Sequence, residues 1–344
     1  MKKGINLILV NTLLFFALLC SCEVNEDVTN PQFTPDSSLS KKGLIANKTG
    51  LKATIVHKEV PYGGRASSTS LVFDNRMWVI AGISYQNAHN DVWFSKDGKE
   101  WFASTNNGEF AQRYGHASTV ADGNMWIAAG MQGNTLFNDV WRSKDGKKWT
   151  QTSKNAPFSA RRFHTLTSIQ NRMFLIGGLS NDVDQTKGDI WVSSDGSQWN
   201  LVTNLAPFGR RYGHAAVFYD NKIWVIGGYD ENGNYLNDVW YSSNGFQWNL
   251  ATANAEFSVR RNHALIANEK GMWLTGGVRE NHQYFNDIWF SNDGINWEKI
   301  EKIKNYPSRA YHSSVYYENR IWIMNGFRQN IGIPNDYYSD IWSY

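Results

Sequence analysis

The stretch that decides the fold is residues 211–248, which read RYGHAAVFYDNKIWVIGGYDENGNYLNDVWYSSNGFQW. It opens with an Arg-x-x-His unit and closes with an Asn-Gly pair shortly before Trp248. Between them lie a double glycine at 227–228 and an Asp-x-Trp unit at 238–240. The apolar runs are short and are separated by turn-forming residues, which is typical of β-strands. We therefore expect a small unit built from several strands.

The same pattern recurs six times, at intervals of 48 to 50 residues, and such a period indicates a repeat architecture. Each unit opens with an arginine, and a glycine follows 17 positions later. All 16 tryptophans fall in repeated columns. The opening arginines are Arg65, Arg113, Arg161, Arg211, Arg260 and Arg309. The aspartates of the Asp-x-Trp units are Asp91, Asp139, Asp189, Asp238, Asp287 and Asp340.

Each unit contains four segments suited to strands, which in the fourth unit are about 214–219, 222–228, 238–243 and 247–252. The second segment is apolar at successive positions, so both of its faces should be buried, as in sheets stacked around an axis. An Asp-Gly or Asn-Gly pair separates the third and fourth segments, and we expect a tight hairpin there with positive φ at both central residues. The double glycines should let backbone pass closely.

These recurring features resemble the kelch motif, and the resemblance covers residues 51–344. It implies an all-β fold, a six-bladed β-propeller in which each blade is a four-stranded antiparallel meander. The segment Asp-Val-Trp-x-Ser-x-Asp-Gly-x-x-Trp is also similar to the sialidase Asp-box, but it lacks the residue between Asp and Gly. We interpret this segment as one that forms a hairpin, and the missing residue weakens a sialidase assignment.

The last unit stops at Tyr344 without a fourth strand, whereas residues 51–58 alternate as a strand would. We predict that 51–58 complete the last blade and close the ring, which removes exposed sheet edges. A meander also places the Arg-x-x-His units and the variable loops at one end, here called the loop face. The Asp-Gly turns lie at the other end, the turn face. The variable loops are 83–90, 131–138, 179–188, 229–237, 278–286 and 327–339.

Residues 1–22 are expected to be a targeting segment, with basic Lys2 and Lys3 followed by an apolar run that ends at Cys22. The segment resembles a bacterial lipoprotein signal peptide, which implies lipid attachment at Cys22. An ordinary cleaved signal peptide or an N-terminal anchor helix is the alternative. Residues 23–50 are polar and predict a flexible tether.

The resemblance to a lipoprotein implies an exported protein with a membrane anchor at the outer membrane. Acidic residues just after Cys22 are similar to surface-export signals, but the sequence leaves open whether the protein faces the periplasm or the medium. The two cysteines of the chain lie in the leader, so the propeller must be held together by packing. The formal net charge of +3 gives no argument for a nucleic-acid partner, and we expect a monomer.

The repeated arginines and aspartates allow two interpretations. The arginines could form a ring of guanidinium groups that binds carboxylate or sulfate groups of a glycan. Alternatively, each arginine could bond the aspartate or loop carbonyls of its own or a neighbouring blade, which suits a motif present in every blade. The histidine column also has two interpretations, metal binding or structural hydrogen bonding, and we favour the second. The histidines are His116, His164, His214, His263 and His312. We predict no metal and no cofactor.

Specific binding should use residues that break the repeat. The ligand-binding candidates are Arg162, Arg210, Arg261, Arg279, Glu280, His282 and Arg328. Arg279 and Glu280, next to Arg328, are the best candidates for an acid/base pair with an anion clamp. The alternative is that these are solvated loop charges.

The function that we expect is a non-enzymatic binding module that displays its loops to a glycan or protein. The second hypothesis is an enzyme similar to the kelch-type sialic acid mutarotases or epimerases, which use Arg and Glu at the channel mouth. A copper radical oxidase similar to galactose oxidase is excluded, because its cofactor needs a cysteine and none follows Cys22.

Overall fold

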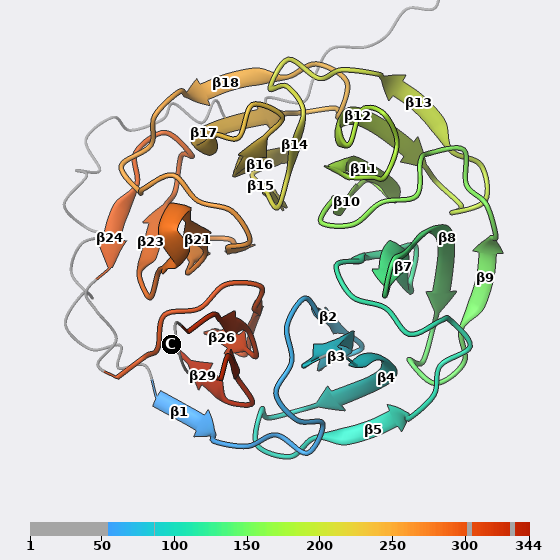
Figure 1. Ribbon diagram of the computed structural model, residues 1–344, viewed down its shortest axis with the longest axis vertical. Coiled ribbons are helices and arrows are strands. Elements are labelled where there is room, and N and C mark those ends of the chain that lie inside the picture. Colours follow the sequence, from blue (N-terminus) through green and yellow to red (C-terminus); the bar gives the residue numbers. More distant parts are fainter. Residues whose placement is uncertain (1–53, 86, 301–304, 331–333) are drawn as a thin grey trace, which may run out of the picture. The chain divides into compact units, whose positions relative to one another are not determined.

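The computed structural model describes residues 54–85, 87–300, 305–330 and 334–344. In the described residues, six antiparallel sheets surround a common axis, five with four strands and one with a short fifth strand. Figure 1 shows this arrangement of blades. This confirms the all-β, six-bladed propeller. The predicted signal peptide (1–22), Cys22 and the tether (23–50) lie outside the described residues. Among the residues that are described, no helix is long and apolar enough to cross a membrane.

Each of the first four blades follows the chain from the axis outward. Blade 1 consists of β2 (Thr69–Phe73), β3 (Arg76–Ser84), β4 (Asn87–Ser95) and β5 (Phe102–Thr105). Blade 2 consists of β6 (Ala117–Ala121), β7 (Asn124–Gln132), β8 (Thr135–Ser143) and β9 (Thr150–Ser153). Blade 3 consists of β10 (Thr165–Ile169), β11 (Arg172–Leu179), β12 (Thr186–Ser193) and β13 (Asn200–Thr203). Blade 4 consists of β15 (Ala215–Tyr219), β16 (Lys222–Asp230), β17 (Tyr235–Ser242) and β18 (Asn249–Thr252), with β14 (Arg211–Tyr212) paired to β16.

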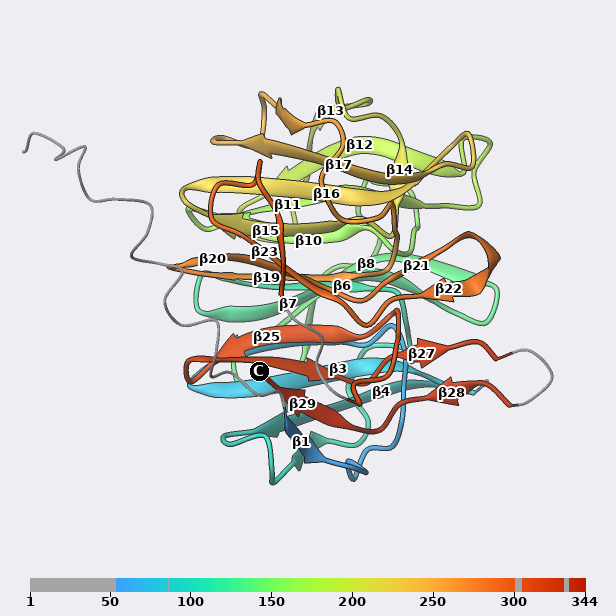
Figure 2. The ribbon, with the colours of Figure 1, turned by 90° about the vertical axis from the view of Figure 1, so that its left-hand side faces the viewer.

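Blades 5 and 6 carry separate short hairpins that project at the loop face (Figure 2, right). Blade 5 consists of β19 (Ala264–Asn268), β20 (Gly271–Thr275), β23 (Ile288–Ser291) and β24 (Glu298–Ile300). Its hairpin is β21 (Val278–Arg279), the 3-10 turn η1 (Glu280–His282) and β22 (Gln283–Tyr284). Blade 6 consists of β25 (Ser313–Tyr317), β26 (Arg320–Met324), β29 (Ile341–Ser343) and β1 (Thr54–His57), and its hairpin is β27 (Phe327–Arg328) with β28 (Asp336–Tyr337).

The ring is closed by the N-terminal strand. β1 pairs antiparallel with β29, so that Thr54 lies opposite Ser343 and Ile55 opposite Trp342. The predicted closure by residues 51–58 is confirmed in the described part, Thr54–His57. As a result, the first and last segments of the propeller are held in one sheet.

The core lies between neighbouring blades. The second strand of each blade is buried along most of its length, and Trp78 and Trp126 are each 1% exposed. One hydrophobic cluster joins Trp78 and Ile80 of blade 1 to Met125 and Ile127 of blade 2. The adjacent blades thus cover both apolar faces of the second strand, as the sequence pattern predicts. This burial of apolar surface is the main favourable term in the free energy of folding.

The predicted turn type between the third and fourth strands is wrong. In blade 1, Gly98 has a φ of +74°, whereas Asp97 does not have positive φ. Asp97 Oδ1 instead accepts hydrogen bonds from the backbone N–H groups of Lys99 and Glu100, at 2.8 and 3.0 Å. An aspartate that bonds the backbone ahead of it forms an Asx turn. Adjacent residues with positive φ do occur, but in the hairpin between the first two strands, as at Asp74 and Asn75.

The hairpin glycines allow each turn to pack on the neighbouring blade. A Cβ on Gly146 of blade 2 would lie 2.1 Å from Cζ3 of Trp78 in blade 1. The first glycine of a double glycine is equally constrained, because a Cβ on Gly177 would lie 2.7 Å from the carbonyl oxygen of Arg211 in the next blade. Both contacts agree with the expectation that the backbone passes closely at these glycines.

Candidate binding site on the loop face

The six repeated arginines are buried, and each pairs with the aspartate of its own blade. In blade 2, Arg113 Nη1 lies 2.7 Å from Asp139 Oδ1 and Nη2 lies 2.8 Å from Oδ2. Arg113 Nη1 also donates to the carbonyl oxygen of Ala129, and Trp141 Nε1 donates to the aspartate. The six pairs are Arg65–Asp91, Arg113–Asp139, Arg161–Asp189, Arg211–Asp238, Arg260–Asp287 and Arg309–Asp340. These guanidinium groups face carboxylates inside the blade, so they are not presented to a ligand.

In three of the pairs, the surroundings of the aspartate favour its charged form. Burial alone would raise the pKa of Asp91, but the hydrogen bond and charge of Arg65 outweigh it and bring the pKa below its ordinary value. The same balance lowers the pKa of Asp189 beside Arg161 and of Asp287 beside Arg260. Each of the six pairs is thus an ion pair inside its own blade.

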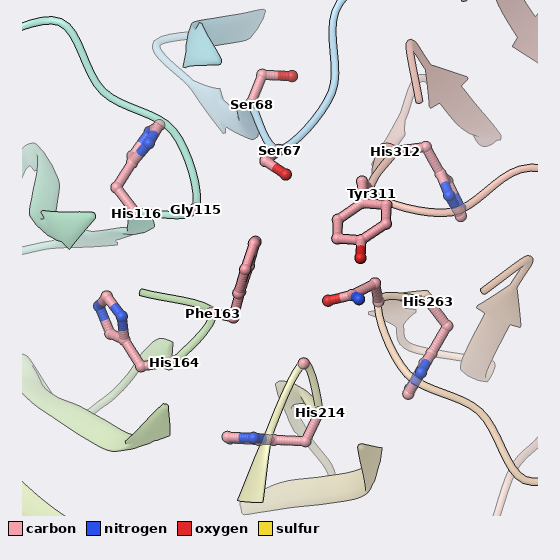
Figure 3. A pocket seen from close by; sticks show the side chains of 12 residues that line it. Ser67, Ser68, Gly115, His116, Phe163, His164, His214, His263, Tyr311 and His312 are labelled. Carbon is pink, nitrogen blue, oxygen red and sulfur yellow. The ribbon is translucent and has the colours of Figure 1, made fainter. Parts of the chain in front are cut away.

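Three histidines of the column, His116, His214 and His312, form hydrogen bonds to the preceding blade. His116 Nε2 lies 3.0 Å from Thr69 Oγ1 of the preceding blade, and His214 Nε2 lies 3.1 Å from Thr165 Oγ1. Burial lowers the pKa of His164 to about 3, so its imidazole is neutral at ordinary pH. Figure 3 shows the imidazoles spread around the axis without converging on one point. In the part of the chain that the structure describes, no group of three or more His, Cys, Asp or Glu side chains could hold a metal ion.

A closed ring of backbone hydrogen bonds surrounds the axis next to the histidines. Each participating residue has a φ between +53° and +62°, and its N–H donates to the carbonyl of the equivalent residue in the preceding blade. The six N···O distances are 2.7–3.1 Å. The residues of this column, called the axial ring, are Ser67, Gly115, Phe163, Gly213, Asn262 and Tyr311. Sequence analysis missed this column because its members share a backbone conformation and not a side chain; the two glycines and the asparagine were the available signal.

The axial ring borders a cavity of about 150 Å³, which the histidines and Ser68 also line. In four blades the ring residue is small. The side chains of Phe163 and Tyr311 instead point into this space from opposite sides, as Figure 3 shows. Their ring centroids are 5.8 Å apart, at an angle of 57°. These two aromatic side chains thus narrow the opening of the cavity around the axis, which is called the mouth of the axis below.

Arg261 lies among tyrosines at this mouth, in the position directly before the axial ring. Its Nη1 donates to the hydroxyl of Tyr212 at 2.6 Å. Its guanidinium carbon lies 4.8 Å from the ring centroid of Tyr229 and 5.4 Å from that of Tyr235. Burial opposes the charge, but the phenol oxygens around it, that of Tyr311 first, raise the pKa of Arg261 above its ordinary value. Its Nε has no hydrogen-bond partner, and among the described residues it has no carboxylate partner.

Arg162 occupies the same position in blade 3. Its Nη1 lies 2.7 Å from the sulfur of Met131, and its guanidinium lies 5.2 Å from the ring centroid of Phe163. It too forms no ion pair with any carboxylate that the structure describes. The structure therefore places two uncompensated positive charges, Arg162 and Arg261, beside the aromatic mouth of the axis.

The other predicted ligand-binding residues lie in different surroundings. Arg210 forms ion pairs with Asp184 at 3.3 Å and Glu231 at 3.1 Å. Arg279 Nε donates a hydrogen bond to Gln283 Oε1 at 2.7 Å. The Oε1 atom of the exposed Glu280 lies farther away, at 3.8 Å from Arg279 Nε.

His282 is exposed on the same hairpin as Arg279, and Arg328 is exposed on β27 opposite Asp336. Glu280 is exposed, whereas a carboxyl that acts as a general acid near neutral pH is usually enclosed in an apolar site. The predicted combination of Arg279, Glu280 and Arg328 therefore consists of solvated groups on two projecting hairpins.

Comparisons with known proteins agree with this architecture. The family model described as "KLHDC2/KLHL20/DRC7 Kelch-repeats domain" matches residues 47–178 and 163–344. A solved structure entitled "Structure of YjhT" matches with a TM-score of 0.66 over 80% of this chain and 94% of that chain, at 18% sequence identity. At that identity the likeness shows the fold alone. None of the curated proteins matches the chain in sequence.

Proposed function

The chain belongs to the kelch-repeat family, and on that premise we propose that it is a binding module that takes an anionic glycan at the mouth of its axis. The observation that carries the proposal is the difference between two kinds of arginine. The six repeated arginines are each neutralised by an aspartate. Arg261 and Arg162 have no such partner among the described residues. A charge left uncompensated next to a cavity favours an anionic ligand.

The surroundings of Arg261 suit a sugar. A guanidinium binds a carboxylate or sulfate through two parallel hydrogen bonds. Tyrosine rings offer apolar faces to the ring of a sugar and hydroxyls to its polar groups. Burial raises the pKa of Tyr284 to about 12 and also raises that of Tyr311, so both phenols keep their protons and can donate hydrogen bonds.

We also propose that the protein is exported and attached to the outer membrane by lipid at Cys22. β1 begins at the turn face, since Thr54 pairs with Ser343 at the end of β29. A chain that comes from the anchor would therefore join the propeller at the turn face.

The test is a glycan-array screen of the purified protein that includes sialylated and uronic-acid sugars. We compare Arg261→Met, which removes the charge but keeps an apolar side chain against the tyrosines, with Arg210→Met as the matched control. Hydrogen bonds to charged groups contribute about 1.5–3 kcal/mol, so Arg261→Met should weaken binding at least tenfold. Arg210→Met should leave it within a few-fold. Equal effects of the two variants, or no glycan bound at all, would reject the proposal and point to a protein partner.

An enzyme similar to the kelch-type sialic acid mutarotases is the second candidate, and the hydrogen bond between Arg261 and the Tyr212 hydroxyl favours it. A hydroxyl beside a guanidinium can relay a proton during sugar ring opening. The check is the rate of anomer exchange, measured by NMR on any sugar that binds. Acceleration that is lost in Tyr212→Phe would assign catalysis to this site, whereas an unchanged rate leaves a binding module.

A further inference from the structure

We propose that a row of aromatic rings, the aromatic track, leads from the axis to the rim of the loop face and binds an acidic oligosaccharide along its length. This inference rests on the proposed function, since it places the terminal anionic unit of that glycan at Arg261. The track consists of Phe163, Tyr311, Phe327, Tyr337 and Tyr85.

The rings of the track are consecutive neighbours. The centroids are 5.8 Å apart for Phe163 and Tyr311, and 6.2 Å apart for Tyr311 and Phe327. The separation is 5.0 Å for Phe327 and Tyr337, and 5.1 Å for Tyr337 and Tyr85. The track therefore starts in blade 3, crosses the projecting hairpin of blade 6 and ends at the tip of blade 1.

The outermost residue of the track, Tyr85, is 72% exposed, and the other four are partly exposed. A continuous set of aromatic residues that solvent reaches on one face is the kind of surface that marks a binding site. Its inner end lies at the two uncompensated arginines. The positive charge of the arginines and the apolar surface of the track thus match an oligosaccharide whose sugar rings have apolar faces and whose terminal unit carries an anionic group.

The repeat itself supplies a control for the inner end of the track. At the positions of Phe163 and Tyr311, blades 2 and 4 have glycine, and the other two have Ser67 and Asn262. The φ values of Phe163 and Tyr311 are +54° and +57°, a conformation that is uncommon for bulky residues. The fold therefore needs only a small residue here. Two strained aromatic residues at the axis indicate a role in binding.

The axis can receive only the end of a ligand. The cavity of about 150 Å³ is smaller than the roughly 300–1,000 Å³ of typical small-molecule sites. The axial ring of backbone hydrogen bonds fixes its width. A ligand whose terminal unit lies at Arg261 must therefore continue outward over the loop face, and the track provides the contacts there.

The outer part of the track is held in place without a ligand. The hydroxyl of Tyr337 donates to the carbonyl oxygen of Tyr85 at 3.0 Å, which ties the hairpin of blade 6 to that of blade 1. The Tyr284 ring lies 6.4 Å from Phe327 and supports the middle of the track. A surface that is ordered before binding loses less freedom when the ligand arrives.

The experiment is calorimetric titration of the full chain with galacturonic acid and its oligomers of two, three and four units. N-acetylneuraminic acid against sialyllactose forms a second series. Each additional aromatic contact contributes about 0.5–1.5 kcal/mol, so affinity should rise about 2- to 13-fold per unit that reaches a ring. Tyr85→Ala and Phe327→Leu should remove the gain of the longer oligomers and leave the monosaccharide affinity unchanged. Phe246→Ala, at an exposed aromatic on the turn face, is the control.

The inner end is tested by Phe163→Gly and Tyr311→Gly, which copy the residue of blades 2 and 4. Both variants should stay folded, checked by Tm, and both should weaken every member of the series. Equal affinity for all chain lengths, with binding still dependent on Arg261, would overturn the track and leave the proposed function standing. The same conclusion follows if long oligomers are insensitive to Tyr85→Ala and Phe327→Leu. If no sugar of either series binds, the proposed function fails and the track fails with it.

Discussion

Replacing Gly146 by alanine tests the packing of one blade on the next. Gly146 lies in the turn between β8 and β9 with a φ of +69°, and its backbone lies against the Trp78 indole. An added Cβ would be 2.1 Å from Trp78 Cζ3, a distance that no relaxed structure contains. Gly123 of the same blade has a φ of +63°, but a Cβ there would meet nothing within 4 Å. Gly123→Ala is therefore the matched control for the backbone effect alone.

The expected loss has two parts. An alanine in the left-handed region costs about 1 kcal/mol, and both variants share this cost. Forcing an extra methyl group into close packing costs a further ~1–3 kcal/mol, and only Gly146→Ala carries it. We therefore expect about 1 kcal/mol for Gly123→Ala and about 2–4 kcal/mol for Gly146→Ala.

Urea denaturation followed by tryptophan fluorescence measures the free energies of unfolding, and calorimetry measures Tm. At about 2–4 °C per kcal/mol, Gly146→Ala should melt roughly 4 °C or more below the wild type. If the two variants lose the same free energy, the turn can move away from Trp78 at no cost. That result would refute the argument that these glycines are required by contact between blades.

Three further predictions concern the repeated columns. Arg113→Met or Asp139→Asn should each cost about 3–5 kcal/mol of stability in denaturation experiments, because either leaves a buried charge unpaired, and a loss below ~1 kcal/mol would contradict the buried pair. Asp145→Ala should lower the free energy of unfolding by about 1 kcal/mol, because two hydrogen bonds from backbone N–H groups are lost. Asp145→Asn should lower it less, because Asn244 accepts the equivalent hydrogen bonds in blade 4. Equal losses for the two variants would argue against the Asx turn. Burial lowers the pKa of His164 to about 3, so the unfolded chain binds a proton that the folded chain does not, and stability should fall as the pH drops from about 6.5 towards 3. His164→Ser, which copies Ser68, should make this loss shallower by about 1.4 kcal/mol per pH unit in melts between pH 7 and 4, and an unchanged slope would place the proton elsewhere.

The sequence predicted the blades well because each unit repeats the same local signals. Residue patterns along the chain are enough to identify the spacing of the repeated columns, the four apolar segments and the 51–58 strand. The turn type was mispredicted, since an Asp-Gly pair is compatible with two turns. The type of turn is set by the carboxylate of Asp97, which accepts hydrogen bonds from the N–H groups of Lys99 and Glu100.

The candidate site was predicted in part. Arg162 and Arg261 were selected because they break the repeat, and the structure places both at the mouth of the axis. Arg210 was selected on the same ground, yet its ion pairs with Asp184 and Glu231 could not be seen in the sequence. Tyr212, Tyr229 and Tyr235 were not selected as the surroundings of Arg261, because loop tyrosines carry no local signal of whether they meet.

The sequence by itself determined the number of blades, their strand order and the closure of the ring, because these depend on the spacing of residues along the chain. It also limited the arginine column to two roles, ligand or partner. Only the tertiary structure decided between them, by setting Arg113 against Asp139 and leaving Arg261 without a carboxylate among the described residues. Charge compensation in the repeated pairs depends on distances between side chains on different strands of one blade. The aromatic contacts of Arg261 depend on distances between side chains from different blades, and the packing of the blades around the axis fixes those distances.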